Sequence, residues 1–421
     1  MAYKAYVTTL KNVRKAENAD RLMIGECLGE QVIVASDMYE GQQVFYIPAD
    51  GQVQEWFGDK YGLFRKDKDG NKAGGYLERN GHVKAMKLRG NRSEGIAIPV
   101  EIIKEVPSDL GQNGAFTKLD GKLAVKKYIP CQKASRNKGQ IKTSKKGKNT
   151  PKKVYPDFNM HIDTAQLMYN QDAFKPGDDI EVTYKLHGTS GRSALVDAEY
   201  KRSWIRKLFH IPAKHKAEYV CGTRRCVVEN SKGGFYGNDQ FRINHHNRLL
   251  PHLEYGMEVF YEIVGWVNKD TTIMPIGDNK KIKDPAFIEE FGDQTIFSYG
   301  CKPGESEIYI YRITKNDREY SPEEIAAWCT LHEFKKVPDA DRFTFTTWED
   351  LMERIDNKYF ADIHDRIDPS HVLEGVVFRI VNRNKFTAFK NKTFAFKVLE
   401  NLIKDTSDAP DMEEAQEEEI N

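Results

Sequence analysis

The chain lacks an apolar run of membrane-spanning length, and this absence predicts no transmembrane helix and no membrane partner. Residues 1–5 lack the apolar core of a secretory signal peptide. The six cysteines are scattered without a Cys-x-x-Cys pair, which argues against structural zinc and disulfides. No internal repeat is visible. We therefore expect a cytoplasmic, intracellular protein that acts as a monomer.

Charge of one sign is missing from two blocks, although the whole chain carries a formal net charge of only +1. Residues 126–153 hold eleven Lys or Arg and no acid, whereas residues 405–421 hold eight acids and no base. We expect a basic flexible linker at 126–155 and an acidic disordered tail at 405–421. The linker either binds phosphates through counterion release or is simply solvated, and both interpretations stay open.

A length of 421 residues predicts two or three domains. Residues 1–125 read as short strands broken by Gly, Asp and Asn, which suits a small closed β-barrel of the OB type. Residues 156–404 mix strands with helices expected at 322–332 and 348–355, which favours antiparallel sheets with flanking helices. The clearest expected strands are 31–35, 43–47, 83–88 and 95–100, then 256–265, 294–299, 307–313 and 372–380.

Residues 200–219 form a basic insertion with six Lys or Arg between Lys201 and Lys216 and no acid. Residues 201–210 predict an amphipathic helix. It is either an extra nucleic-acid clamp or a cap that packs on the domain.

The stretch Glu181-Val182-Thr183-Tyr184-Lys185-Leu186-His187-Gly188-Thr189-Ser190 carries the strongest chemical signal. Alternation predicts a strand that ends at Lys185. A turn of small and hydroxylated residues follows, and Gly188 lets the backbone approach a ligand closely because it lacks a Cβ. A lysine at such a point is either a plain edge residue or an amine with a chemical task.

This stretch resembles the Lys-x-(Asp/His)-Gly nucleophile motif of the covalent nucleotidyltransferases, which include DNA ligases, RNA ligases and mRNA capping enzymes. Four further stretches follow in the order of that superfamily. They are Cys221-Gly222-Thr223-Arg224-Arg225, Val259-Phe260-Tyr261-Glu262-Ile263-Val264-Gly265, Leu373-Glu374-Gly375-Val376-Val377-Phe378-Arg379 and Phe394-Ala395-Phe396-Lys397-Val398-Leu399. Each stretch alone is weak, but five in order make chance improbable.

The amino-terminal part is similar to the Deinococcus-type RNA ligases, which place an OB domain before the nucleotidyltransferase domain and seal nicked duplexes. The similar stretches are Asn18-Ala19-Asp20-Arg21-Leu22, Gln43-Val44-Phe45-Tyr46-Ile47-Pro48, Val83-Lys84-Ala85-Met86-Lys87-Leu88-Arg89-Gly90 and Ser93-Glu94-Gly95-Ile96-Ala97-Ile98-Pro99. The resemblance covers about residues 1–120 and 156–404. It implies an α+β fold, with an OB-type barrel at 1–125 and an antiparallel-sheet nucleotidyltransferase domain at 156–404.

The resemblance implies that Lys185 attacks the α-phosphorus of ATP and holds AMP as a covalent intermediate. Burial or nearby cations would have to lower the pKa of this lysine, and Lys397 with a bound Mg²⁺ or Mn²⁺ would supply the positive field. Glu374 would hold the metal, because hard cations prefer oxygen ligands. Glu262 would contact the ribose or the metal-bound waters.

Two further residues would bind the nucleotide. Arg224 would contact the ribose side, and Tyr311 is either the aromatic residue that stacks on adenine or an ordinary packing residue. Position 187 is His where many members have Asp, and Tyr184 stands where relatives often carry Glu. The fifth motif usually offers two lysines two residues apart, so Lys390 and Lys392 compete with Lys397 for that place.

We therefore expect an ATP-dependent RNA ligase that joins a 3′-hydroxyl to a 5′-phosphate, at nicks in RNA or RNA-containing duplexes. A DNA ligase or a capping-type nucleotidyltransferase is the first alternative, and an OB domain that precedes the catalytic domain disfavours both. A non-catalytic nucleic-acid-binding relative is the second, and the presence of Lys185, Glu374 and Lys397 argues against it.

Overall fold

The computed structural model describes most of the chain, and the statements below concern that part. The described residues are 3–16, 22–66, 68–72, 77–88, 90–103, 114–128, 153–158, 164–200, 213–224, 226–228, 236–282, 284–383 and 385–406. Residues 18–21, Arg89, Arg225, most of the basic linker, the helix expected at 201–210 and residues 407–421 of the acidic tail lie outside them.

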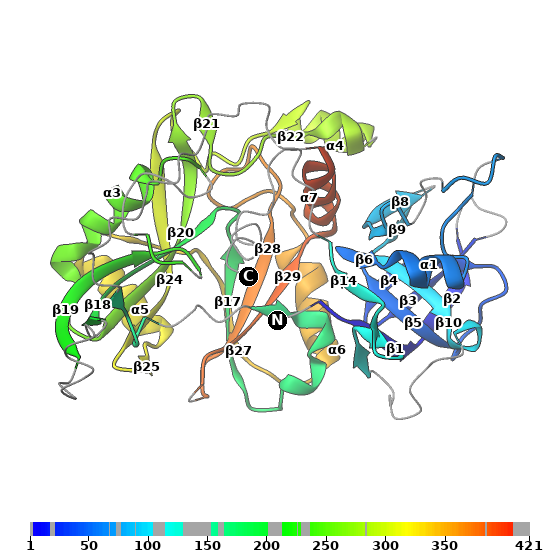
Figure 1. The fold of residues 1–421 in the computed structure, drawn as a ribbon, viewed down its shortest axis with the longest axis horizontal. Helices are drawn as coiled ribbons and strands as arrows, with labels where there is room; N and C mark the ends of the chain where they lie inside the picture. The colour runs from blue at the N-terminus through cyan, green and yellow to red at the C-terminus, as the bar shows by residue number, and fades with distance from the viewer. Residues whose placement is uncertain are drawn as a thin grey trace. The chain divides into compact units, whose positions relative to one another are not determined.

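The described residues divide into two compact units (Figure 1). The first is drawn from Met1–Pro130, Ala165–Gln171 and Phe394–Asp405, and the second from Cys131–Thr164, Asp172–Thr393 and Thr406–Asn421. The sequence-based division placed residues 165–171 and 394–404 in the catalytic domain. The structure instead packs both segments with the amino-terminal residues.

The first unit consists mainly of antiparallel strands. In one sheet, β5 (Gln43–Pro48) lies between β10 (Gly95–Pro99) and β1 (Ala5–Thr9), and β11 (Ala115–Phe116) follows β1. A second has the order β2 (Lys11–Lys15), β3 (Leu22–Cys27), β4 (Glu30–Ala35), and a third the order β14 (Val125–Lys127), β6 (Gly51–Val53), β7 (His82–Val83). Two hairpins, β8 (Met86–Leu88) with β9 (Asn91–Ser93) and β12 (Lys118–Leu119) with β13 (Lys122–Leu123), complete the pairing.

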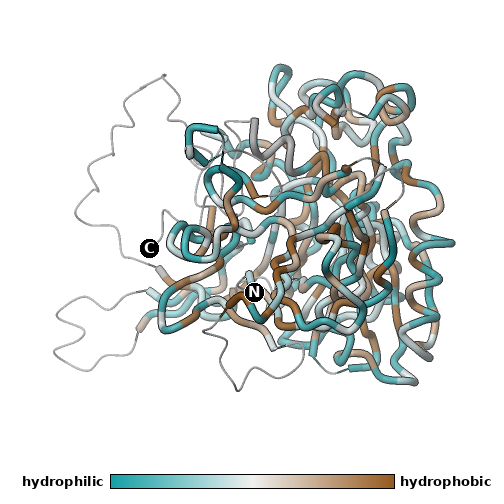
Figure 2. The backbone as a smooth tube through the Cα atoms, turned by 90° about the vertical axis from the view of Figure 1, so that its right-hand side faces the viewer, coloured by the Kyte–Doolittle hydropathy of each residue, from teal (hydrophilic) through white to brown (hydrophobic). Residues whose placement is uncertain are grey.

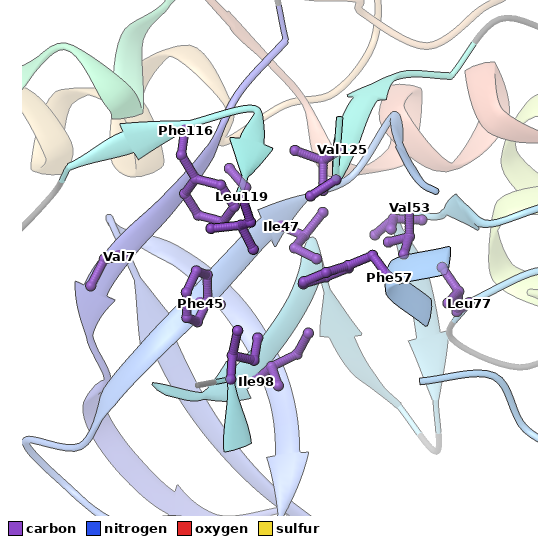
Figure 3. Packing of buried hydrophobic residues seen from close by; sticks show 14 of the residues in the cluster. Val7, Phe45, Ile47, Val53, Phe57, Leu77, Ile98, Phe116, Leu119 and Val125 are labelled. Atoms are coloured by element: carbon purple, nitrogen blue, oxygen red, sulfur yellow. The ribbon is translucent and has the colours of Figure 1, made fainter. Parts of the chain in front are cut away.

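Short helical segments complete the first unit. They are α1 (Glu55–Lys60), the 3₁₀ turns η1 (Val100–Ile102) and η2 (Leu167–Tyr169), which follows the short strand β16 (Ala165–Gln166), and α7 (Phe394–Thr406). Alternation sends successive side chains of a strand to opposite faces. Strand β5 buries both faces, because Phe45 and Ile47 join one apolar cluster and Val44 and Tyr46 join another. Figure 3 shows Phe45 and Ile47 of β5, Phe57 of α1, Phe116 of β11 and Val125 of β14 pointing toward one another, and all five are buried.

The second unit contains two large antiparallel sheets. The first runs β15 (Lys153–Val154), β18 (Thr189–Tyr200), β20 (Met257–Asn268), β24 (Ser306–Lys315), β25 (Arg318–Glu319), with β19 (Lys214–Gly222) also on β18, β21 (Thr271–Thr272) on β20 and β26 (Lys335–Lys336) on β24. The second has the order β29 (Thr387–Lys392), β28 (Gly375–Ile380), β17 (Asp179–Lys185), β27 (Asp339–Thr344). A small pair joins β22 (Gly277–Asp278) to β23 (Gln294–Thr295).

Helices accompany these sheets in Figure 1: α3 (Gln240–Leu249), α4 (Pro285–Phe291), α5 (Pro322–Leu331) and α6 (Trp348–Arg354). Shorter turns are η3 (Gln171–Ala173), η4 (Leu250–His252), η5 (Asn279–Ile282) and η6 (Ile355–Tyr359). Helix α5 begins with the expected cap, because the Ser321 side chain accepts from the Glu324 backbone and the Glu324 side chain bonds back to the Ser321 backbone. The two helices expected at 322–332 and 348–355 are thus confirmed.

The hydropathy of the residues changes repeatedly along the backbone. Figure 2 shows hydrophobic stretches alternating with hydrophilic ones, as expected for strands that bury one face. No helix in the described ranges is long and apolar enough to cross a membrane.

Candidate active site

Strand β17 delivers Lys185 to the end of the second sheet. Ile180 and Val182 are fully buried, so the strand is fixed by its apolar face and Lys185 is its last residue. Lys185 is the Cα partner of Gly375 on β28, and Gly375 is in turn the partner of Lys392 on β29. Directly opposed residues of antiparallel strands project to the same face, so Lys185 and Lys392 flank a glycine that adds no side chain between them.

A buried carboxylate joins the two lysines. Glu374 immediately precedes β28, and its side chain is only 2% exposed. Its Oε2 lies 3.0 Å from Lys185 Nζ, and its Oε1 lies 3.4 Å from Lys392 Nζ. The Nδ1 atom of His187 is 3.9 Å from the same Oε2. A buried carboxylate requires such partners, because desolvation of an unpaired charge is costly.

The turn after Lys185 packs against β20. A Cβ added to Gly188 would lie 2.4 Å from the carbonyl oxygen of Ile263 and 2.9 Å from Cγ of Glu262. A glycine is therefore required at position 188 because the backbone passes close to β20. The sequence analysis explained the same glycine by the close approach of a ligand. The same packing sets Glu262, which is half-buried on β20, beside the His187–Gly188 turn.

Tyr299 anchors the same turn, and no sequence motif marks it. Its hydroxyl accepts a hydrogen bond of 2.6 Å from the His187 backbone N–H. Burial, with the carboxylates of Asp365, Glu374 and Glu262, raises the pKa of Tyr299 well above its usual range. Its φ of 50° is uncommon for a non-glycine residue. A neutral hydroxyl next to several carboxylates is thus held in a sparsely populated backbone conformation.

Tyr311 lies at an irregularity of the first sheet. The register between β20 and β24 shifts between Phe260 and Tyr261, so Tyr311 has no directly opposed residue. Such bulges re-aim side chains and are over-represented next to active sites. The Tyr311 hydroxyl lies 3.4 Å from Oγ of Ser190, three residues after His187. The structure therefore connects Tyr311 with the segment that follows the nucleophile motif.

Arg224 and Tyr184 are not brought into the lysine–carboxylate cluster by the contacts above. Arg224 is half-buried in the turn after β19, whose Thr223 carbonyl accepts from Nε of Arg192 at 2.7 Å. Tyr184 precedes Lys185 and so projects to the opposite face of the strand. The Arg366 guanidinium lies over its ring, with its carbon 5.4 Å from the ring centroid.

Lys397 is placed differently from the sequence-based expectation. Residues 394–399, which resemble the fifth motif, begin helix α7 of the first unit, where buried Phe396, Leu399 and Glu400 share a helical face. Lys390 and Lys392, the alternative pair, lie two residues apart on β29 and share the face of Lys185. The lysine that the structure brings to Glu374 is therefore Lys392.

The Lys397 ammonium is held by two carboxylates of its own unit. Its Nζ lies 3.0 Å from Oε1 of Glu30, and it also contacts Glu94. Burial and the Glu94 carboxylate raise the pKa of Glu30 to about 8. Burial has the same tendency at Glu94, but the Lys397 ammonium outweighs it and lowers the pKa of Glu94. Burial opposes the charge of Lys397 as well, yet the two carboxylates raise its pKa above the ordinary value.

The carboxylates near the His187–Gly188 turn do not form a complete set of metal ligands in the part of the chain that the structure describes. Within the described ranges, no group of three or more His, Cys, Asp or Glu could hold a metal ion. Glu262 and Glu374 both approach the His187–Gly188 turn, one from β20 and one through the ion pair of Lys185. Two carboxylates suit a hard cation that takes its other ligands from phosphates and water.

Comparison with known proteins gives a structural match only. No protein-family model matches the chain, and no curated protein matches it significantly. Solved structures of Naegleria gruberi RNA ligase do match. One mutant with ATP and Mn is 17% identical at a TM-score of 0.59, covering 95% of this chain and 99% of that chain.

Two further structures of the same ligase agree. A mutant with AMP and Mn is 16% identical at a TM-score of 0.58, and the protein with PPi is 16% identical at 0.57; each covers 93% of this chain and 97% of that chain. The chain shares its fold with this RNA ligase. The α+β class expected from the sequence is confirmed at that level.

Proposed function

We propose that the protein is an ATP-dependent RNA ligase that joins a 3′-hydroxyl to a 5′-phosphate through a Lys185–AMP intermediate. The observation that carries the proposal is the Lys185–Glu374–Lys392 cluster, in which both oxygens of one buried carboxylate contact lysines. The match to an RNA ligase solved with ATP, AMP and Mn supports the choice of nucleotide.

In the first step, the Lys185 amine attacks the α-phosphorus of ATP, an N–P bond forms and the bond to pyrophosphate breaks. Glu374 Oε2 is within hydrogen-bond distance of that amine and can accept its proton. Lys392 on the same face offers positive charge to the phosphates, and Lys390 extends it along β29. Mg²⁺ or Mn²⁺, held by Glu374 and Glu262 with the phosphates, would neutralise charge on the transferred group.

In the later steps, a 5′-phosphate oxygen attacks the phosphorus of the bound AMP and the N–P bond to Lys185 breaks. A 3′-hydroxyl then attacks the activated 5′-phosphate, forms the phosphodiester bond and releases AMP. For nucleotide binding, the proposal assigns Tyr311 to the adenine, Arg224 and Glu262 to the ribose side, and His187 with Gly188 to the turn beside the phosphates. Tyr184 projects to the other face of its strand, away from the face of Lys185, and receives no nucleotide contact here.

We further propose that the amino-terminal unit is an OB-type domain that grips the duplex near a nick. In its β8–β9 hairpin, the exposed residues Lys87 and Arg92 are directly opposed. Two exposed cationic side chains at neighbouring positions suit an anionic partner such as a phosphate backbone. Lys84, just before this hairpin, is ion-paired with Glu78 at 3.2 Å.

The test is incubation with ATP or GTP labelled at the α-phosphate, followed by a panel of nicks with RNA or DNA on each side. We expect label from ATP alone to become covalently attached in the wild type. The Lys185→Ala variant should lose the adduct and keep its affinity for duplex, because many dispersed basic groups carry that binding. Adduct formation by Lys185→Ala would show that the nucleophile is another residue. Labelling by GTP in place of ATP would favour a capping-type enzyme.

A further inference from the structure

Helix α3 places a buried arginine, Arg242, against Thr189 and Ser190, the first residues of β18. Arg242 is 1% exposed. Its guanidinium donates through Nη1 to the Ser190 carbonyl and through Nη2 to Oγ1 of Thr189 at 3.2 Å. Asp239, three residues earlier, contributes a carboxylate oxygen 3.8 Å from Nε. The charged group is therefore directed at two consecutive residues of β18, directly after the His187–Gly188 turn.

Those two residues lie where the proposed nucleotide contacts meet. Ser190 is the Cα partner of Glu262 on β20, and its Oγ lies 3.4 Å from the Tyr311 hydroxyl. One guanidinium thus fixes the backbone between the proposed nucleophile, the proposed adenine platform and the proposed ribose contact.

Stability alone does not account for a charge at this position. Helix α3 is already held to β18 by His246, whose Nδ1 lies 2.9 Å from Oγ of Ser193. Burial lowers the pKa of His246 to about 4, so that ring is neutral near pH 7. Apolar side chains also hold helices on sheets, and a buried ion pair is often no more stable than its hydrophobic replacement. Phe241 and Leu249 of the same helix already pack in the apolar core of this unit.

We propose that Arg242 is a positioning residue that sets Ser190 and Tyr311 for recognition of the adenine nucleotide. This inference rests on the proposed function. A lysine at position 242 keeps the charge but cannot span both acceptors with a rigid fork. Loss of one hydrogen bond to a charged group corresponds to a change of roughly tenfold or more in affinity. We therefore expect Arg242→Lys to raise the KM for ATP in adduct formation about tenfold and to narrow the preference for ATP over GTP.

The experiment compares the full-length wild type with Arg242→Lys, Arg242→Gln and the control Arg248→Gln. Arg248 lies on the same helix, is 46% exposed and pairs with Glu307 at 3.0 Å, away from β18. Single-turnover adduct formation is measured over a series of ATP and GTP concentrations, and thermal unfolding is recorded for each variant. The control should retain the wild-type KM and nucleotide preference.

The outcomes separate the two proposals. If the wild type forms no adduct with either nucleotide, the proposed function fails and the role of Arg242 fails with it. If the wild type reacts, but the Arg242 variants keep its KM and its ATP preference, only the positioning role is overturned. A slower rate at unchanged KM and preference, or a loss that follows the melting temperature alone, would show that Arg242 merely supports the fold. A raised KM with narrowed preference in folded Arg242→Lys supports the inference.

Discussion

At the scale of single residues, substitution of Lys392 should affect adduct formation, whereas substitution of Lys397 should affect stability. Lys392→Ala should slow adduct formation by about 10²-fold or more, because it removes a cation from the face of Lys185 where phosphate charge is transferred. Lys397→Ala should leave the chemical step of adduct formation close to wild type. It should instead destabilise the amino-terminal unit by about 3–5 kcal/mol, since Glu30 and Glu94 lose their shared cation.

Single-turnover labelling with ATP, recorded beside thermal unfolding, distinguishes the two lysines. Each variant serves as the control of the other, because both remove one ammonium group. The assignment made here is wrong if Lys397→Ala stops labelling while the protein remains folded, or if Lys392→Ala labels at the wild-type rate.

The sequence predicted some of these residues better than others. Lys185 stands three residues before Gly188 and Glu374 directly before Gly375, both in short, ordered motifs, so their pairing could be expected. The stretch around Lys397 resembles the fifth motif, but its residue pattern does not reveal that the buried Phe396 and Leu399 have the spacing of a helix and belong to the amino-terminal unit. Tyr299 and Arg242 could not have been found, because nothing local marks a hydroxyl or guanidinium that acts on a segment far away in sequence.

At the scale of elements, the attachment of α7 should respond to pH. A folded-state pKa of about 8 for Glu30 lies above its ordinary value of 4.5. The folded state therefore retains a proton that the unfolded chain releases, and this stabilisation is lost as pH rises from about 4.5 to 8. The slope for one proton is at most roughly 1.4 kcal/mol per pH unit. The pKa of Glu94 is shifted in the opposite direction, downward. Its contribution to the free energy of unfolding is therefore present at neutral pH and is lost as pH falls below the ordinary pKa of a glutamate.

Unfolding of the wild type and of Glu30→Gln across pH 5 to 8 measures this contribution. The amide resembles the protonated carboxyl in shape, so the variant should remain stable and should lose the downward slope. Asp172→Asn, which replaces a carboxylate on an exposed position of the second unit, is the matched control and should keep the wild-type slope. Equal slopes in wild type and Glu30→Gln would show that Glu30 is ionised in the folded state.

Element boundaries were predicted where alternation was long. The strands expected at 307–313 and 256–265 appear as β24 and β20. Strand β24 is longer at both ends, whereas β20 begins one residue later than expected and ends three residues later. The strand expected at 83–88 divides into β7 and β8, and the one expected at 294–299 shrinks to Gln294–Thr295. The left-handed backbone of Tyr299 cannot belong to a strand, and its residue type gives no warning of that conformation.

At the scale of the whole molecule, removal of residues 1–125 should leave adduct formation and weaken nick sealing. All the residues assigned here to nucleotide chemistry belong to the second unit, whereas duplex binding needs a larger phosphate footprint. Each lost phosphate contact should flatten the salt dependence of binding by roughly 0.9 in log–log slope on duplex DNA. The measurements are adduct formation, sealing of a pre-adenylylated nick, and binding across a salt series.

The truncation needs a companion variant that also lacks residues 394–421. Deleting only residues 1–125 removes Glu30 and Glu94 and leaves Lys397 and the apolar side chains of α7 without their own unit. We expect the doubly truncated protein to be the more soluble of the two. Unchanged sealing and salt slope in both would show that the amino-terminal unit serves a partner other than the duplex.

The salt-bridged attachment of α7 also fixes an order of events during synthesis. Glu30 and Glu94 leave the ribosome early, but Lys397 follows only after the whole second unit has been made. At roughly 5–20 residues per second, that interval is on the order of tens of seconds. Until α7 has been made, Glu30 and Glu94 therefore lack the Lys397 ammonium that both contact in the folded unit. A chain that ends before α7 would lack one helix of its amino-terminal unit. That unit would then be the part of the truncated chain that cellular quality control recognises as incompletely folded.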